Sequence, residues 1–333
     1  MSARPTELVI STAPFAREAA TTPRIMLEVL AAALLVLVFA CWNFGVSSLL
    51  VVAASTAGAM GTERFFVGSR ERSTLGDYSA ALTGVLLGLT LPPILPLWMA
   101  FLGGVAGIGL GKLIWGGLGQ NLFNPALIGR AFLQAAFPTA ITTWAAPAPS
   151  AGFFAVPSSL LALPLMQGKV DAVSAATPLG LAKFENTVSS FGPLFFGQTS
   201  GSVGETSALL LILCGVWLAA RRIFDWRPAV STLVAVAVFS GALHLVNPEA
   251  YPPPWFMLLS GGLLFGTVFM VTDPVTTPTT PRGAWIFGLG VGFLVVLIRL
   301  FGGLPEGVMY AILLMNAVVP HINRAMQPKP FGA

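Results

Sequence analysis

The sequence is dominated by apolar segments long enough to cross a lipid bilayer, separated by short polar stretches. Hydrophobic residues fill 55% of the 333 positions and charged residues only 9%, whereas a soluble domain has about a quarter charged residues. A transmembrane helix requires roughly 17–25 residues. Ten segments approach that length, at about 25–43, 46–62, 77–92, 96–114, 122–138, 204–220, 228–246, 255–272, 284–301 and 306–320. The sequence therefore predicts an all-α polytopic membrane protein embedded in the lipid bilayer.

Lysines and arginines between these segments predict the orientation, because cytoplasmic loops are enriched in both. With the N-terminus inside, 13 of the 17 basic residues lie in inner segments, two lie in outer segments, and Arg130 and Arg299 lie within spans. Both termini are therefore expected in the cytoplasm, with the long 139–203 loop on the opposite side of the membrane. The net charge of +4 comes from basic residues that set the orientation of the chain in the membrane, and it does not indicate a nucleic-acid partner.

A faint internal repeat predicts two halves. Gly84-Val85-Leu86-Leu87-Gly88 resembles Gly262-Leu263-Leu264-Phe265-Gly266, and Pro138 and Pro320 close the fifth and tenth spans after similar residues. Five spans per half require inverted repeats, which usually place binding sites where the halves meet; chance recurrence of Gly and Pro is the alternative. The predicted layout is a cytoplasmic tail at 1–24, a first five-helix repeat at 25–138, an extracytoplasmic loop at 139–203, a second repeat at 204–320 and a cytoplasmic tail at 321–333.

The outer loop contains a run of small residues, Asp171-Ala172-Val173-Ser174-Ala175-Ala176-Thr177-Pro178-Leu179. We expect no core contribution from this run, and we expect the Thr177 hydroxyl to be accessible because its neighbours are too small to shield it. Loops of small, hydroxyl-bearing residues are common in proteins. Assigning a function to this run therefore depends as much on its position in a membrane protein as on the run itself.

Two polar stretches lie at the predicted inner membrane boundary. Asn121 and Asn124 precede the fifth span, and Thr272 and Asp273 end the eighth. Irregular backbone at this depth is tolerated only where protein or a wet cavity satisfies it, so these residues are candidate ligand contacts. The alternative is a capped helix start at Asn124, with Pro125 at the first helical position, and a threonine-rich turn after Asp273. Asn124-Pro125-Ala126 also resembles the water-channel triplet, which leaves a solute channel or transporter as a competing function.

Together these motifs closely resemble the membrane family that contains the D subunit of the Rnf electron-transport complex and the B subunit of the sodium-pumping NADH:quinone reductase. The resemblance covers nearly the whole chain and includes residues 119–126, 171–179, 204–208, 272–275 and 305–309. The short N-terminal tail favours the Rnf branch, and the quinone reductase branch is the alternative. The resemblance implies an ion-translocating ferredoxin:NAD oxidoreductase complex, in which the A, B, C, E and G subunits are the partners and electron flow is coupled to sodium or proton transport.

For cofactors, the resemblance implies FMN joined by a phosphoester to Thr177, with Asp171 and Ser174 at the motif's other positions for recognition by a flavin transferase. It also implies a second, non-covalent flavin, riboflavin, inside the bundle. Asn121, Asn124, Thr272 and Asp273 could hydrogen-bond the pyrimidine edge of that flavin. No catalytic residue or metal-ligand set is expected, so the chain would be an electron relay within an enzyme complex.

Ionisable residues within or beside spans are functional candidates. Arg130 lies about 9 Å of helix rise beyond Asn124 and should face the interior. Glu205, beside the flavin loop, is either a flavin contact or a charge that favours a helix N-terminus. Arg299 and Glu306 are expected near the outer interface, where a long arginine can extend to water.

Smaller residues in the spans are expected to serve packing. Cys41 and Cys214 are too few for an iron–sulfur cluster and are expected to behave as small apolar residues, with a disulfide between them left open. Gly103, Gly107 and Gly111 form a ridge in the fourth span that allows close approach of another helix.

Overall fold

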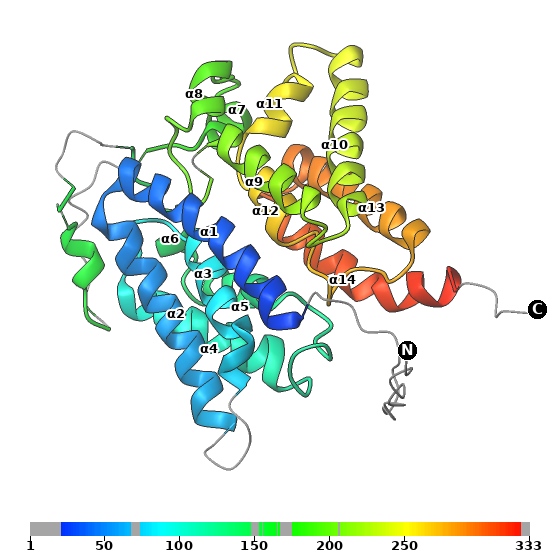
Figure 1. Ribbon diagram of the computed structural model, residues 1–333. Helices are drawn as coiled ribbons and strands as arrows, with labels where there is room; N and C mark the ends of the chain where they lie inside the picture. The colour runs from blue at the N-terminus through cyan, green and yellow to red at the C-terminus, as the bar shows by residue number, and fades with distance from the viewer. Residues whose placement is uncertain are drawn as a thin grey trace, which may run out of the picture.

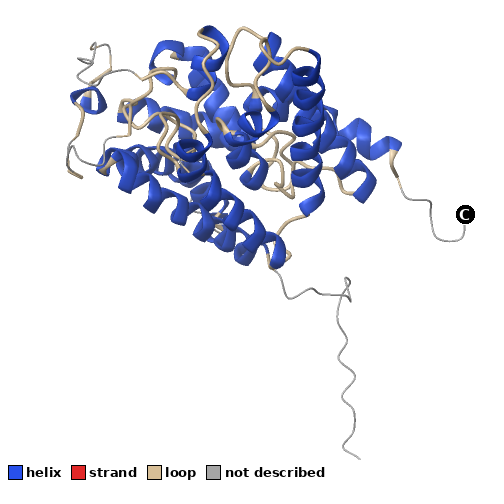
Figure 2. Cartoon of the chain, turned by 90° about the horizontal axis from the view of Figure 1, so that it is seen from above, coloured by secondary structure: helices blue, strands red, loops and turns tan. Residues whose placement is uncertain are grey.

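The computed structural model describes residues 21–67, 74–147, 153–154, 156–164, 166, 175–205 and 207–327. Within these ranges the regular elements are helices and no β-strand occurs (Figures 1 and 2). Three of them are long and apolar enough to cross a membrane: α1 (Thr22–Phe44), α10 (Trp226–Val246) and α13 (Pro281–Phe301). The prediction of an all-helical membrane protein is confirmed at this level, and the full set of ten spans stays a prediction.

In the first half of the chain, glycines allow neighbouring helices to pack closely. It contains α2 (Val46–Val67), α3 (Ser79–Leu89), α4 (Leu97–Ile108) with a π-helical extension at Gly109–Leu113, α5 (Pro125–Ala136) and α6 (Pro138–Ile141). A Cβ atom on Gly107 would lie 2.9 Å from the Pro125 carbonyl oxygen, and one on Gly111 would lie 2.7 Å from the Pro125 Cα. The glycine ridge therefore brings α4 against the start of α5, as predicted.

The predicted eighth span, 255–272, is broken. It consists of α11 (Pro254–Leu259) and α12 (Leu263–Phe269), with residues 260–262 outside both helices. Gly261 has a φ of +63°, a left-handed conformation that glycine adopts without steric cost. A Cβ atom on Gly261 would also overlap the Glu306 carboxylate. The segment predicted as the eighth span is therefore interrupted at this glycine, which makes room for an acidic side chain.

Two predicted span ends also differ from the structure. Helix α14 (Val308–Ala325) continues through Pro320, so the boundary predicted at that residue is wrong. Proline removes one backbone hydrogen bond, but the following turn still buries Ile322 against the core. Helix α9 (Ala208–Ala220) begins four residues later than the predicted start at 204, because residues 203 and 204 bond to the end of α3.

The described parts of the 139–203 loop pack onto the bundle. They include a short 3-10 helix at Ser158–Leu161, α7 (Pro178–Phe184) and α8 (Phe191–Phe196). Leu179 is only 6% exposed and belongs to the main apolar cluster, so the expectation that the 171–179 run adds nothing to a core is wrong at this residue. In Figure 1, α7 and α8 lie at the end of the molecule away from the start of α1 and the end of α14.

Candidate functional site: an outer and an inner cavity

A cavity of about 740 Å³ lies beside α7. Three of the candidate site residues, Arg130, Thr177 and Glu205, line it together with Glu306. They come from α5, the start of α7, the segment before α9 and the segment before α14. The volume falls within the roughly 300–1,000 Å³ of small-molecule and cofactor sites. We refer to this space as the outer cavity.

Thr177 is the N-cap residue of α7. Its backbone is extended, and its Oγ1 accepts a hydrogen bond from the Gly180 amide at 3.1 Å, which satisfies one of the free amides of the first helical turn. The residue is half-buried at the cavity wall, so its hydroxyl is less exposed than the sequence indicated. Asp171 and Ser174 lie outside the described residues.

Lys183 fastens α7 to the rest of the bundle. Its Nζ donates to the carbonyl oxygens of Arg299 and Leu304, both at 3.0 Å, and to that of Gly302. These carbonyls surround the C-terminal end of α13, where helix carbonyls lack partners within the helix. Partial burial lowers the pKa of Lys183 below its usual value, because desolvation disfavours the charged form. The helix that begins at Thr177 is thus held in place at its other end.

Arg130 faces the protein interior, as predicted. It is 9% exposed, and its Nη1 donates to the Thr90 carbonyl oxygen at 2.7 Å. Thr90 follows the last residue of α3, so the guanidinium binds a carbonyl at a helix end.

Glu205 is held next to the end of α3 by backbone bonds. The Val203 amide donates to the Leu91 carbonyl oxygen at 3.0 Å, and the Gly204 amide donates to that of Leu89. The N-cap of α9 is Ser207, whose Oγ accepts from Leu210 at 3.3 Å. Glu205 therefore precedes the helix and does not cap it, and it lines the outer cavity.

Arg299 is buried and paired with Glu306, so the expectation that Arg299 extends to water is wrong, whereas Glu306 is half-buried. Arg299 is 3% exposed and donates to the carbonyl oxygens of Met257 at 2.6 Å and Ser260 at 3.0 Å. Its Nη2 also lies 3.3 Å from Glu306 Oε1. The break after α11 leaves backbone carbonyls without helical partners, and the arginine satisfies them. Sequence reasoning missed this pair, although both residues flank one predicted outer loop.

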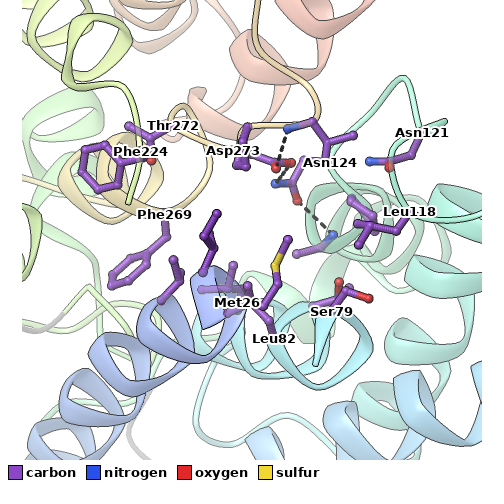
Figure 3. Close-up of a pocket in the computed structure, with 18 of the residues that line it drawn as sticks. Met26, Ser79, Leu82, Leu118, Asn121, Asn124, Phe224, Phe269, Thr272 and Asp273 are labelled. Carbon is purple, nitrogen blue, oxygen red and sulfur yellow. Dashed lines mark hydrogen bonds between the residues drawn. The ribbon is translucent and has the colours of Figure 1, made fainter. Parts of the chain in front are cut away.

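The four polar candidates at the inner boundary line a second, smaller cavity of about 70 Å³. Figure 3 shows Asn124 lying between Asp273 and Asn121 in this inner cavity. Asn124 caps α5: its Oδ1 accepts from the Ala126 and Leu127 amides at 3.0 and 3.4 Å, and its Nδ2 donates to Asp273 Oδ2 at 3.2 Å. The structure therefore contains the helix cap expected at Asn124, and it brings together the polar stretches that contain Asn124 and Asp273, as expected.

The Asp273 side chain, like that of Asn124, takes part in three hydrogen bonds. It accepts from Asn124, from Thr276 Oγ1 at 3.1 Å and from the Val275 amide at 3.2 Å. Burial raises the pKa of the Asp273 carboxyl, and these three hydrogen bonds oppose the increase. In the described chain, Asn121 and Thr272 make only local side-chain bonds: Asn121 accepts from the Gly119 amide and donates to the Phe123 carbonyl oxygen, and Thr272 donates to that of Val268.

Asn316 of α14 joins the two polar stretches, and sequence reasoning missed this role. Its Oδ1 accepts from the Asn124 amide at 3.4 Å, and its Nδ2 donates to the Thr276 carbonyl oxygen at 3.1 Å. Asn316 is fully buried. The available signal was an amide in the middle of an apolar span, where a polar side chain needs a partner.

A buried ion pair beside the inner cavity was also missed. Lys112, which lines the cavity and is 3% exposed, donates to both carboxylate oxygens of Glu63 at 2.9 and 2.8 Å and to Ser79 Oγ at 2.6 Å. In the sequence, Lys112 counts only among the basic residues that predict topology. Two opposite charges at the inner ends of the second and fourth spans were the sequence signal for this pair.

The two cysteines do not form a disulfide. Cys41 is half-buried, Cys214 is buried, and both are free thiols. The alternative that the sequence left open is therefore resolved in favour of packing residues.

Comparison with known proteins gives consistent matches. The family model described as the NQR2, RnfD, RnfE family matches residues 9–332. The D subunit of the proton-translocating ferredoxin:NAD(+) oxidoreductase complex of Clostridium ljungdahlii is 40% identical over 97% of this chain and 96% of its own length. The D subunit of the ion-translocating oxidoreductase complex of Stutzerimonas stutzeri is 40% identical over 93% and 92% of the two chains. The corresponding D subunit of Escherichia coli strain SMS-3-5 / SECEC is 36% identical over 97% and 98%.

Proposed function

The chain belongs to the NQR2, RnfD, RnfE family, and on that premise we propose that it is the membrane-embedded D subunit of an ion-translocating ferredoxin:NAD oxidoreductase complex. Relatives bearing that name cover nearly the whole chain. Its partners would be the other subunits of the complex. It would relay electrons through bound flavin and would not by itself oxidise ferredoxin or NADH.

We further propose that FMN is joined to Thr177 through its phosphate and extends into the outer cavity. The observation that carries this proposal is that Thr177 lies on the wall of a 740 Å³ cavity. That space suits a three-ring cofactor. Arg130 and Glu205 supply charged groups on the wall of the same cavity. The bound flavin would supply electron transfer, while the protein holds it in place and tunes its electronics.

Replacing Thr177 with alanine tests the attachment. The chain should still insert into the membrane, but the denatured band should lose its in-gel flavin fluorescence and the mass that corresponds to FMN. Thr187→Ala serves as the matched control, because Thr187 is an exposed threonine of the same segment. A fluorescent band for Thr177→Ala would show that the attachment point lies elsewhere.

The proposal also includes a second, non-covalent flavin, riboflavin, at the inner cavity. The convergence of Asn121, Asn124, Thr272 and Asp273 on one space supports it. At about 70 Å³, the cavity is smaller than a flavin ring requires. Binding there would require the Asn124–Asp273 hydrogen bond to open and the surrounding helix ends to separate.

A further inference from the structure

The outer cavity holds two oppositely charged side chains that belong to no ion pair of the described residues. Arg130 and Glu205 both line it, and neither takes part in the salt bridges of the described chain. Buried charges are normally paired or fully hydrogen-bonded. Arg130 and Glu205 lie close enough to interact electrostatically, but they form no direct ion pair, so their remaining hydrogen-bonding groups indicate a ligand that offers both an acceptor and a donor.

Arg130 is the donor of this pair. A guanidinium carries five N–H groups in a rigid planar fork, and one nitrogen, Nη1, is directed to the Thr90 carbonyl oxygen at 2.7 Å. This bond holds the Nη1 end of the guanidinium at the end of α3. The cavity-facing remainder of the guanidinium can donate to a planar ligand edge.

Glu205 is the acceptor. A carboxylate has about four lone-pair sites, whereas Glu205 receives one long hydrogen bond, from the Ser202 amide at 3.5 Å. Its carboxylate lies beside Gly201 and Gly262, where a Cβ atom would approach its oxygens to 3.2 and 2.8 Å. Two glycines thus leave the space that this carboxylate occupies.

The neighbouring carboxylate, Glu306, is already satisfied. It accepts from Arg299 and Val308, both at 3.3 Å, and from the Gly262 amide at 3.1 Å. Glu306 and Glu205 therefore lie close to the same glycine, but within the described chain Glu306 accepts three hydrogen bonds and Glu205 only one, so Glu205 has the larger acceptor capacity for a ligand.

We propose that Arg130 and Glu205 bind the pyrimidine edge of the flavin carried by Thr177, with Arg130 donating to a ring carbonyl or N1 and Glu205 accepting the N3–H. The inference rests on the proposed attachment of FMN. The pyrimidine edge alternates acceptors and a donor, so it complements one guanidinium and one carboxylate. Both residues are positioning groups that also act through their charge.

This arrangement makes the two residues act on the flavin in opposite directions. Reduction adds negative charge to the ring, mainly at its pyrimidine part. A nearby positive charge stabilises the reduced form and a nearby negative charge destabilises it, with little screening inside a protein. Arg130 should therefore raise the reduction potential, and Glu205 should lower it.

The test is a spectroelectrochemical titration of the flavin that remains covalently attached in the purified complex. Glu205→Gln should shift its one-electron reduction equilibrium at least about tenfold toward the reduced form, which corresponds to about +59 mV. Arg130→Gln should shift the equilibrium by a similar factor in the other direction. Arg130→Lys keeps the charge and should shift it less than Arg130→Gln.

Glu249→Gln is the control, since Glu249 is an exposed carboxylate in the loop after α10, outside the cavity lining. The flavin of this variant should titrate as in the wild type. In-gel fluorescence must first show that each variant carries the flavin. If it does, and neither variant moves the potential or both move it in one direction, the pyrimidine-edge assignment is wrong while attachment at Thr177 stands. If fluorescence also persists in Thr177→Ala, the proposed attachment itself has failed.

Discussion

At the scale of single residues, the charged side chains inside the protein are of two kinds: those that form ion pairs with each other, and those that keep unused hydrogen-bonding capacity. Lys112 is paired with Glu63 and Arg299 with Glu306 within the protein, although the Nε of Arg299 has no hydrogen-bond partner among the described residues. The side chains of Arg130 and Glu205 each have a single hydrogen bond within the described chain and border the outer cavity. Ionisable groups inside a membrane protein are costly; the first two pairs offset that cost within the protein, and for Arg130 and Glu205 we propose that a ligand does so.

Lys112→Met should destabilise the protein strongly. It leaves the Glu63 carboxylate without its ammonium partner, and breaking a buried ion pair costs roughly 3–5 kcal/mol. Adding Glu63→Leu should recover most of that loss, because replacing both partners by apolar residues is often close to neutral. The measurement is the fraction of monodisperse protein that survives a temperature series in detergent.

Arg221→Met provides the comparison for that series, since it removes an exposed partner of Glu28. Its effect should be much smaller, because exposed ion pairs contribute little. A double variant that is no more stable than Lys112→Met would show that Glu63 is held for another reason.

At the scale of elements, the candidate residues lie at helix ends and breaks. Asn124 and Thr177 are N-caps of α5 and α7, Asp273 follows α12, and Glu205 and Glu306 precede α9 and α14. Helix ends expose backbone groups that polar side chains or ligands must satisfy. In an otherwise apolar chain, the polar candidate residues are therefore concentrated at the helix ends.

Local signals were sufficient to predict some of these elements. Asn before Pro predicted the start of α5, and the glycine ridge predicted the close packing of α4. The break between α11 and α12 could not be predicted, because it depends on Glu306, 45 residues beyond Gly261 in the sequence. The Lys112–Glu63 pair likewise depends on which faces of two helices meet. Apolar periodicity does not specify those faces when lipid and protein are both apolar.

The double variant Asn124→Ala/Asp273→Ala tests the inner cavity, which these helix ends form. If riboflavin binds there, acid-extractable flavin per mole of protein should fall, the Thr177 flavin should remain, and electron flow through the complex should decrease. Loss of the Asn124 cap should also cost the α5 start about 1 kcal/mol.

Asn247→Ala is the control that separates loss of flavin binding from loss of a structural asparagine. Asn247 follows α10, and its Oδ1 accepts the amides of Glu249 and Ala250, both at 3.2 Å, so it is a comparable loop-holding asparagine away from the inner cavity. Unchanged extractable flavin in the double variant would assign Asn124 and Asp273 to structure alone.

At the scale of the whole molecule, the two cavities lie toward opposite ends of the bundle, which suits a relay across a membrane. Met26, near the start of α1, lines the inner cavity, whereas the start of α7 lines the outer one. These two helix starts lie at different ends of the molecule (Figure 1). Electron transfer between the cavities would therefore run along the bundle, through α5 and α14, which contact each other.

The last prediction is the orientation of this axis in the membrane. Thirteen of 17 basic residues fall in the segments assigned to the inside, and cytoplasmic loops of membrane proteins carry that excess. We therefore expect the Thr177 end outside the cytoplasm. In a background with Cys41 and Cys214 replaced by alanine, Thr187→Cys should react with an impermeant thiol reagent added to intact cells. Gln120→Cys, also at an exposed position, should react only after the membrane is opened. The reverse pattern would place the flavin on the cytoplasmic side and would require electrons to cross the bundle in the opposite sense.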